Sequence, residues 1–565
     1  MAPNLKTGAR ANGNAGRFSS NASKDTEIIP SPFDYIVVGA GSAGCLLARR
    51  LVDAGKSVCL LESGGRDNHP FVHLPAGFVK TLVNAKLTWR YRTEGCPGSD
   101  GRRIPMVHGR MLGGTSSVNG MVYVRGQAED YDAWERMGNA GWGFRGVLPY
   151  FKAIEARVGE GDEQHRGRDG EMPVTDSDWR HPLCDAFIDA AAALGIPRGG
   201  DPNGAGQHGA GYYQRNIRGG RRISSARAFL RPVLRNAGLD LRTRAHVTGI
   251  VFEGKRAVGV RYVRDEDRSH AIELRAREVI LCAGALASPK LLQLSGVGPA
   301  AALQGIGVPV LHALAGVGES LRDHYSLRVT LRAKGATTIN DLARGPRLLA
   351  EALRWMRGRP SILAVSAAIA YAFVKSEPRL ATPDAALIFT PASYEGGVLG
   401  LLDRFPGMTC GGWQLRPESQ GYVRARSNDP FQLPSVQPNY LDREADRIVA
   451  VATLRMLRRI LAVPAMARYC EAELAPGPDV ASDDDLLDYA RRTSTTCCHP
   501  VGTCKMGPAR DPLAVVDAEL RVHGLGGLRV VDASIMPMIT SGNTNAPTMM
   551  IAAKAADLIL LGAGA

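Results

Sequence analysis

The chain has 565 residues and a mass of 60.3 kDa, with 69 Lys and Arg against 55 Asp and Glu, a formal net charge of +14. Hydrophobic residues (45%) and charged residues (22%) occur in the proportions of a globular protein, which excludes a disordered, collagen-like or coiled-coil chain. The length predicts two or three domains, and 65 glycines predict many tight turns and close approaches of the backbone to a ligand.

The N-terminal residues 1–32 are rich in Asn, Gly, Ser and Ala and have no apolar run that would form the core of a signal peptide. We predict a disordered tail, with a basic transit peptide up to Ser23 as the alternative. The longest strongly apolar stretch, residues 362–374, is too short to cross a membrane, so we interpret it as a core segment.

The ten cysteines are too irregularly spaced for a disulfide framework, which favours a cytoplasmic location. The positive charge is compatible with peripheral contact to the inner membrane. No Lys/Arg block interleaves with aromatic residues, so nucleic acid is not an expected partner. Cys497, Cys498, His499 and Cys504 cluster without the paired spacing of a zinc site, so we predict no metal.

The first predicted element is a buried parallel strand over 34–38, which runs into the turn Gly39-Ala-Gly41-Ser-Ala-Gly44. A helix follows and ends at Gly55, and a second apolar strand over 57–61 ends in Glu62. In such a unit the glycines allow a tight turn and close approach to a pyrophosphate, and the acid accepts hydrogen bonds from a ribose. The sequence therefore predicts a dinucleotide site, for which NAD and FAD are both candidates at this point.

Further elements of a nucleotide-binding sheet recur along the chain. The sequence predicts a Gly/Ser loop over 110–123, a strand over 279–283 followed by Gly284 and a helix over 288–294, a strand over 528–532, a loop over 541–547 and a closing helix over 548–560. Residues 325–490 differ: they suggest a strand over 326–333, an amphipathic helix over 347–356 and short strands within 415–440. We expect two interleaved domains.

Six ordered segments resemble the glucose-methanol-choline (GMC) oxidoreductases, most closely the bacterial choline and alcohol dehydrogenase members. They are DYIVVGAGSAGCLLARRL at 34–51, GRMLGGTSSVNGMVYVRG at 109–126, GALASPKLLQLSGVGP at 284–299, GVGESLRDH at 316–324, HPVGTCKMG at 499–507 and VVDASIMPMITSGNTNAPTMMIAAKAADLI at 530–559.

The resemblance implies the GMC fold: a Rossmann-type α/β domain that binds FAD, interleaved with an α+β substrate domain built on an antiparallel sheet. We predict that the FAD domain comprises 33–165, 222–325 and 512–565, and that the substrate domain comprises 166–221 and 326–511. FAD is favoured over NAD because an NAD enzyme would not need the loop at 109–126 or the C-terminal segment.

The resemblance also implies which residues bind FAD. Those expected at the adenosine, pyrophosphate, ribityl and ring portions are Gly39, Gly41, Ser42, Ala43, Gly44, Glu62, Ser63, Gly113, Gly114, Asn119, Gly120, Met121, Val122, Val247, Ala283, Gly284, Asp532, Ala533, Thr544 and Asn545. In covalently flavinylated members a His precedes the Asn of the glycine loop, whereas this chain has Val118 there. We therefore expect non-covalent FAD.

By the same resemblance, His499 is the base that takes the hydroxyl proton of a primary alcohol while hydride passes to flavin N5. Asn543, 11 residues before Lys554, is expected to orient the alcohol oxygen, with Asn545 as the competing position. Cys497 and Cys498 precede the base and are interpreted as small buried hydrophobes near the pocket. The remaining histidines that we considered are expected to be surface or structural residues: His73, His108, His324 and His523.

The expected function is FAD-dependent oxidation of a primary alcohol to an aldehyde, with electrons passed to a quinone or another acceptor. An oxidase that passes them to oxygen is the nearest alternative. A lyase or photodecarboxylase on the same fold, and a flavin-binding protein without turnover, remain alternatives of other classes. The sequence leaves the alcohol and the oligomeric state open.

Overall fold

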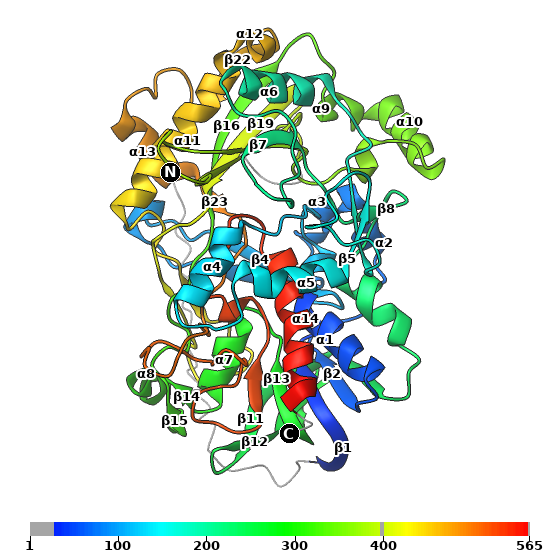
Figure 1. Ribbon diagram of the computed structural model, residues 1–565, viewed down its shortest axis with the longest axis vertical. Coiled ribbons are helices and arrows are strands. Elements are labelled where there is room, and N and C mark those ends of the chain that lie inside the picture. The colour runs from blue at the N-terminus through cyan, green and yellow to red at the C-terminus, as the bar shows by residue number, and fades with distance from the viewer. Residues whose placement is uncertain (1–26, 396–400, 563–565) are drawn as a thin grey trace, which may run out of the picture.

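The computed structural model describes residues 27–395 and 401–562, which form two large sheets stacked along the long axis of the molecule (Figure 1). The predicted combination of a mainly parallel sheet with a separate antiparallel sheet is confirmed. Segments from the N-terminus, the middle and the C-terminus of the chain share the first sheet, so the two halves are interleaved as expected.

The first sheet has the order β10-β2-β1-β13-β12-β11, with β24 also paired to β13. Pairings of β10, β2, β1, β13 and β24 are parallel, whereas β12 is antiparallel to both β11 and β13. The bounds of its strands are β1 Glu27–Val38, β2 Val58–Glu62, β10 Leu239–Thr243, β11 Ala245–Glu253, β12 Arg256–Arg264, β13 Asp267–Leu281 and β24 Leu528–Val530.

The central strands are buried on both faces, which explains their unbroken apolar sequence. Ile36 and Val37 of β1 are 0% exposed, and every residue of β2 is buried. Helices α1 (Ser42–Asp53) and α14 (Asn545–Gly562) pack against each other beside this sheet, drawn blue and red in Figure 1. The two ends of the chain therefore build one core.

The second sheet is antiparallel throughout, in the order β22-β16-β19-β18-β17-β7, with β23 also paired to β16. Helices α6 and α11 cover one of its faces, and its other face looks toward the first sheet. The bounds of its strands are β7 Gly209–Tyr212, β16 Tyr325–Ala333, β17 Ala370–Val374, β18 Ala385–Thr390, β19 Gly407–Gln414, β22 Cys470–Ala475 and β23 Thr495–Thr496.

The remaining helices and two-stranded ribbons lie around these sheets. The helices are α2 Pro70–His73, α3 Phe78–Thr81, α4 Ala128–Arg136, α5 Phe144–Ile154, α6 Pro182–Ala193, α7 Ala287–Leu294, α8 Ala300–Gly305, α9 Ile339–Leu342, α10 Gly345–Met356, α11 Glu444–Ala462, α12 Pro464–Ala467 and α13 Asp483–Thr493. The ribbons are β3 Thr88–Arg92 with β4 Pro105–Gly109, β5 Glu155–Val158 with β6 Met172–Thr175, β8 Ile217–Arg218 with β9 Arg221–Arg222, β14 Val297–Gly298 with β15 His312–Ala313, and β20 Tyr422–Arg424 with β21 Ser435–Gln437.

Two expected boundaries are wrong. The tail does not extend to residue 32, because β1 begins at Glu27 and residues 27–29 continue the ladder along the long strand β13. The last helix begins at Asn545 rather than Thr548. Pro547 is accommodated in its first turn, because N–H groups there have no acceptor within the helix and proline lacks only that group. Residues 1–26 of the expected tail lie outside the described part of the chain.

Within residues 27–395 and 401–562, no helix is both long enough and apolar enough to cross a membrane. All ten cysteines have free thiols. The described residues include no group of three or more His, Cys, Asp or Glu side chains placed to hold a metal ion.

Candidate active site

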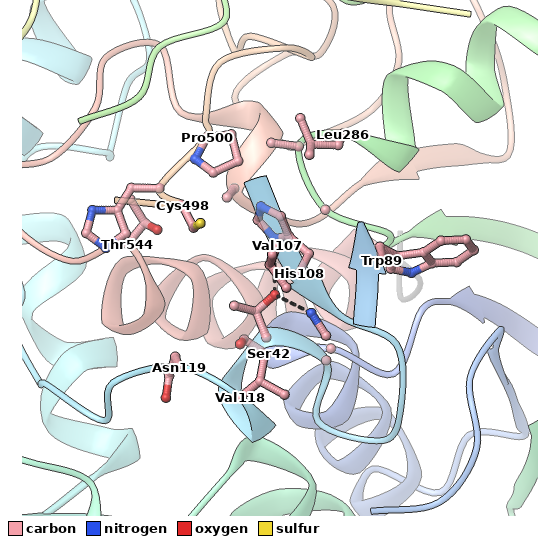
Figure 2. A pocket seen from close by; sticks show the side chains of 18 of the residues that line it. Ser42, Trp89, Val107, His108, Val118, Asn119, Leu286, Cys498, Pro500 and Thr544 are labelled. Atoms are coloured by element: carbon pink, nitrogen blue, oxygen red, sulfur yellow. Dashed lines mark hydrogen bonds between the residues drawn. The ribbon is translucent and has the colours of Figure 1, made fainter. Parts of the chain in front are cut away.

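One large cavity of about 540 Å³ lies between the two sheets. Figure 2 shows part of its lining, with Ser42, Val118 and Asn119 from the N-terminal part of the chain and Cys498 and Thr544 from the C-terminal part. One end of the cavity is built mainly by the glycine turn after β1 and by the N-termini of helices that pack on the first sheet. The other end is built by side chains of the second sheet. These are called the nucleotide end and the substrate end below.

The nucleotide end depends on backbone segments that touch. A Cβ on Gly44 would lie 1.9 Å from the Gly39 carbonyl oxygen, so only glycine lets α1 start this close to the strand. Gly114 has φ +50°, and a Cβ there would lie 2.8 Å from the Gly41 Cα. The glycine loop therefore rests on the first turn of α1 and narrows the cavity to a slot along the backbone.

Glu62 lies at the tip of β2 with both carboxylate oxygens held by backbone amides. Ala40 N donates to Oε2 at 3.0 Å, and Gly64 N donates to Oε1 at 2.7 Å. Burial raises the pKa of Glu62 to about 7, while these two N–H groups favour the charged form. Each oxygen keeps a further lone pair for a hydroxyl donor in the cavity.

Two helix N-termini meet at the nucleotide end. Ser42 Oγ at the start of α1 donates to Asn545 Oδ1 at the start of α14, over 2.7 Å. Both residues line the cavity. Because each N-terminus presents unsatisfied N–H groups and the positive end of a helix dipole, this junction suits a diphosphate.

Asp532 lines the nucleotide end just after β24, the strand that pairs with β13. Its Oδ2 accepts from Gly284 N at 2.8 Å and from Ser288 Oγ at 2.6 Å, and its Oδ1 accepts from Ser534 N at 2.8 Å. Burial raises the pKa of Asp532, and these donors oppose the rise. The carboxylate therefore fixes the turn after β13 relative to the segment after β24.

The loop of residues 118–122 continues from the nucleotide end toward the substrate end. Asn119 Oδ1 accepts from Met121 N at 3.1 Å and from the buried Arg222 Nη1 at 2.7 Å. Met121 has φ +61°, a left-handed conformation that is uncommon for a residue with a side chain, and it lines the cavity. Val118 is 0% exposed and packs with Val72 and Met111.

His499 lies where the two ends of the cavity meet and makes one hydrogen bond through each ring nitrogen. Its Nε2 lies 3.1 Å from Asn543 Nδ2, and its Nδ1 lies 3.0 Å from His324 Nδ1. The preceding residue, Cys498, has φ +58°, a left-handed conformation that turns the next side chain into the cavity. His499 and Asn543 therefore converge on one point, although 44 residues separate them.

The hydrogen-bond chain defines the tautomer of His499. His324 Nε2 lies 2.9 Å from the Leu415 carbonyl oxygen, which can only accept, so this nitrogen carries the proton. In neutral His324 the Nδ1 is then an acceptor, and His499 Nδ1 must donate to it. His499 Nε2 is then the unprotonated nitrogen, and its lone pair accepts from the Asn543 amide.

The electrostatics of this cluster keep the imidazoles neutral. Burial lowers the pKa of His499 well below its usual range, and His324 and His108 lower it further. Burial also lowers the pKa of His324 to about 4. Asp323 Oδ1 accepts from the His499 backbone N at 2.7 Å, and burial raises its pKa to about 6. At neutral pH a free base therefore lies beside a buried carboxylate.

The substrate end is the inner face of the antiparallel sheet. Along β16, residues 327, 329 and 331 face the core under the helices, whereas Ser326, Arg328 and Thr330 line the cavity. Trp413 of β19 also lines it and lies beside His499, with ring centroids 6.3 Å apart. Polar and aromatic side chains from strands far apart in the sequence thus surround the space next to His499.

Cys497 and Cys498 both line the cavity. Burial raises the pKa of Cys498 to about 12 and that of Cys497 well above its usual range. The two thiols are protonated at neutral pH, which fits their interpretation as small apolar groups.

The sequence-predicted site residues were placed as follows. Gly44 and Gly113 do not line the cavity: Gly44 forms the contact between α1 and the turn, and Gly113 N donates to the Ala40 carbonyl at 2.7 Å. The others line it, namely Gly39, Gly41, Ser42, Ala43, Glu62, Ser63, Gly114, Asn119, Gly120, Met121, Val122, Val247, Ala283, Gly284, Asp532, Ala533, Thr544 and Asn545, together with His499 and Asn543.

Sequence reasoning missed several residues of the site. His324 was expected at the surface or in a structural role, yet it is 0% exposed and bonds to His499. His108 also lines the cavity rather than lying apart from it. Asp323, Arg328 and Trp413 were not singled out. The available signal was the segment 316–324, which ends in Asp323 and His324 and carried the family resemblance without a role for either residue.

Comparisons with known proteins show what the chain resembles. Family models described as GMC oxidoreductase match residues 33–326 and 417–552. The chain is 40% identical to an alcohol dehydrogenase [acceptor] of Pseudomonas putida, with 94% of this chain and 96% of that one covered. It is 41% identical to an oxygen-dependent choline dehydrogenase of Pseudomonas fluorescens, with 93% of each covered.

Among solved structures, pyridoxine 4-oxidase from Mesorbium loti superposes with a TM-score of 0.83 at 31% identity, covering 93% of this chain and 98% of that one. Formate oxidase superposes with a TM-score of 0.87 at 24% identity, covering 96% and 99%, which supports the fold alone.

Proposed function

The chain belongs to the GMC oxidoreductase family, and from this premise we propose that it oxidises a primary alcohol to an aldehyde with bound FAD, His499 acting as the base. The observation that carries the proposal is that the unprotonated His499 Nε2 and the Asn543 amide converge on one point of the cavity. An alcohol hydroxyl placed there donates to Nε2 and accepts from the amide.

The residues of the nucleotide end fit FAD. The contact between Gly44 and the turn, the two helix N-termini at Ser42 and Asn545, and the amide-bound Glu62 match a diphosphate joined to an adenosine. When bound, the flavin supplies the acceptor for the hydride that leaves the carbinol carbon. Val118 offers no nucleophile to the ring, so we propose that FAD is held without a covalent bond.

The protein's own part of the reaction is proton removal. His499 Nε2 takes the hydroxyl proton, and the resulting imidazolium keeps its Nδ1–H bond to His324 Nδ1. Asp323, whose carboxylate holds the His499 backbone N–H, supplies negative charge close to the ring. Asn543 Nδ2 donates to the oxygen as it gains negative charge, so removal of the proton from the alcohol leaves an alkoxide held in place for loss of the hydride.

For the electron acceptor we favour a quinone or another acceptor over oxygen, with peripheral contact to a bilayer. The supporting observation is α10, on which Leu349, Leu353 and Met356 recur at helical spacing and are 62%, 40% and 64% exposed. The exposed Arg347 and Arg357 lie at the two ends of this helix. An exposed apolar stripe with basic neighbours suits an anionic lipid surface.

Sedimentation with vesicles tests the bilayer contact. Anionic phosphatidylglycerol vesicles should carry the holoenzyme down at low salt, and Leu349→Glu with Met356→Glu should release it. The matched control is Ile448→Glu on α11, which replaces a side chain of similar exposure, 55%, away from α10. Equal sedimentation of all three proteins would contradict the contact.

Anaerobic titration of the purified protein with linear, aromatic and choline-type alcohols tests the main proposal. Bleaching of the flavin absorbance by one class supports alcohol oxidation, and recovery of the colour in air would favour the oxidase alternative. A flavin that no alcohol bleaches would favour the lyase or photodecarboxylase. Acid precipitation of the same sample should leave the FAD in the supernatant, and a coloured pellet would contradict non-covalent binding.

A further inference from the structure

We infer that the buried carboxylate of Asp130 positions the Asn543 amide against His499. Asp130 does not line the cavity, so it acts through the loop that carries Asn543 rather than on the substrate. The inference rests on the proposed alcohol oxidation and adds a positioning residue to it. The hydrogen bonds on the two sides of Asn543 carry the argument.

The Asn543 side chain depends on its loop for its place. Among the described residues its hydrogen-bond partner is His499, whose Nε2 lies 3.1 Å from Asn543 Nδ2. Asn545, two residues later, starts α14 and accepts from Ser42 Oγ at 2.7 Å, which fixes the loop on that side. The amide can keep one position only if Ser541, two residues earlier, is fixed as well.

Ser541 is held at all three of its polar groups. Its backbone N donates to Asp130 Oδ2 at 2.7 Å, and its Oγ donates to Asp130 Oδ1 at 2.8 Å. Its carbonyl oxygen accepts from Gln207 Nε2 at 2.8 Å. Ser541 and Asp130 are both 0% exposed, so bulk water does not compete for these bonds. Asp130 therefore provides two of the three bonds that fix the loop before Asn543.

Asp130 is itself fixed from two directions. It is the third residue of α4, where its Oδ2 also accepts from Gln127 N at 2.8 Å. Its Oδ1 also accepts from Arg416 Nε at 2.7 Å, and Arg416 lies two residues beyond the end of β19. Each carboxylate oxygen thus accepts two hydrogen bonds, and the guanidinium balances the buried charge.

Two glutamines complete the network around this carboxylate. Gln127 Oε1 accepts from Arg416 Nη2 at 2.6 Å, and Gln127 Nε2 donates to Gln207 Oε1 at 2.8 Å and to the Pro383 carbonyl at 2.9 Å. Pro383 lies just before β18, and Arg416 just after β19. Helix α4, which lies between the two sheets in Figure 1, therefore ties the loop before α14 to the second sheet as well as to the first.

The loss of Asp130 should release the loop. In Asp130→Ala the Ser541 N–H and hydroxyl are buried without their acceptor, so the loop must move to satisfy them. The Asn543 amide then moves relative to His499 Nε2, and a misplacement of about 1 Å can cost about a hundredfold in rate. We expect bleaching of the flavin by a saturating alcohol to slow by about ten- to a hundredfold.

A double-mutant cycle separates positioning from general support of the fold. Stopped-flow bleaching under anaerobic conditions is compared in the wild type, Asp130→Ala, Asn543→Ala and the double variant. Without Asn543 there is no amide to position, so adding Asp130→Ala should change the rate by less than about threefold. Asp132→Ala is the matched control: it removes a carboxylate of the same helix that accepts from Phe144 N at 2.8 Å, and it should bleach like the wild type. Asp130→Asn keeps one oxygen that can accept from Ser541, so it should recover part of the rate.

A spectroscopic measurement does not depend on turnover. The nitrogen-15 resonance of His499 Nε2 in the histidine-labelled holoenzyme should shift when its lone pair loses the Asn543 donor, and Asn543→Ala gives the size of that shift. Asp130→Ala should shift the resonance in the same direction, whereas Asp132→Ala should leave it at the wild-type position.

Two results would overturn the inference: equal slowing by Asp130→Ala with and without Asn543, or an unchanged His499 Nε2 resonance in Asp130→Ala. If no alcohol bleaches the wild-type flavin, the proposed oxidation fails, and the resonance still decides the role of Asp130. Should Asp130→Ala not retain FAD, Ser541→Ala decides, because it removes only the hydroxyl bond to Asp130. A slower rate that requires Asn543 would then support the inference, and an unchanged rate and spectrum would reject it.

Discussion

The two ends of the cavity are built by different means. The nucleotide end consists of main chain: a glycine turn against α1, two helix N-termini, and carboxylates whose oxygens are occupied by N–H groups. The substrate end consists of side chains that project from one face of an antiparallel sheet, on strands that include residues 325–333 and 407–414. His499 and Asn543 lie at the boundary.

The two ends should therefore respond differently to substitution: the nucleotide end tolerates most side-chain changes, whereas the substrate end determines which substrate binds. A site built from main-chain N–H groups binds a diphosphate whatever side chains its residues carry. It loses the ligand when an added Cβ or a lost turn displaces the backbone. A side-chain site changes its ligand with each substitution and leaves the fold unaltered. The same scaffold can therefore hold one cofactor and accept different alcohols.

Gly44→Ala should break the nucleotide end and produce the largest effect. The new Cβ would meet the Gly39 carbonyl oxygen at 1.9 Å, and backbone cannot move aside as a side chain can. We expect FAD occupancy to fall about tenfold or more, measured as the flavin-to-protein absorbance ratio after purification. Gly305→Ala, where no atom lies within 4 Å of the added Cβ, should retain full occupancy. Full occupancy in Gly44→Ala would show that α1 can shift without loss of the site.

His499→Asn should spare the nucleotide end and remove the chemistry. The rate of anaerobic flavin bleaching by a good alcohol should fall by about 10² to 10⁴, because the base is lost while FAD stays bound. Stopped-flow absorbance measures this rate directly. His208→Asn, at an exposed loop position, is the matched control and should bleach like the wild type. A change of less than about threefold in His499→Asn would assign the proton to another group.

More of the nucleotide end than of the substrate end could be predicted from the sequence, because the first is built from local motifs and the second from contacts between distant segments. Gly39, Gly41 and Glu62 belong to one local strand-turn-helix-strand motif, so a short window predicts a nucleotide site there, whereas Asp532 was expected at the cofactor from the family resemblance. The role of His324 depends on contacts with His499 and with the Leu415 carbonyl, both of which lie far along the chain. The sequence predicted a strand over 326–333, but no local pattern indicated which of its two faces lines the cavity.

His324→Leu should change the protonation of His499, at the junction of the two ends, without loss of FAD from the nucleotide end. Removing the acceptor leaves His499 Nδ1–H without its partner, so neutral His499 divides between two tautomers and only one has a free Nε2. We expect bleaching to slow by about ten- to a hundredfold with FAD retained. Nitrogen-15 spectra of histidine-labelled protein should show an unprotonated Nε2 in the wild type and a mixture in the variant.

His324→Gln distinguishes positioning from packing. The glutamine carbonyl can accept from His499 Nδ1–H, so this variant should recover part of the rate and the single tautomer. An unmixed tautomer in His324→Leu would refute the tautomer argument even if the rate fell.

Asp323→Asn should have the smallest effect and appear mainly in the pH profile. His499 stays neutral through the range near pH 6, because burial holds its pKa well below the usual value. Asp323, whose pKa burial raises to about 6, loses its charge as the pH falls through that value. The imidazolium that forms during proton transfer then lacks a nearby anion, so kcat should fall on the acid side by about tenfold. The carboxamide introduced by Asp323→Asn carries no charge at any pH, so the variant should show the lower rate throughout and no step near pH 6. A step that persists in Asp323→Asn would belong to His499 itself, and the buried carboxylate would then serve the backbone of the base rather than its charge.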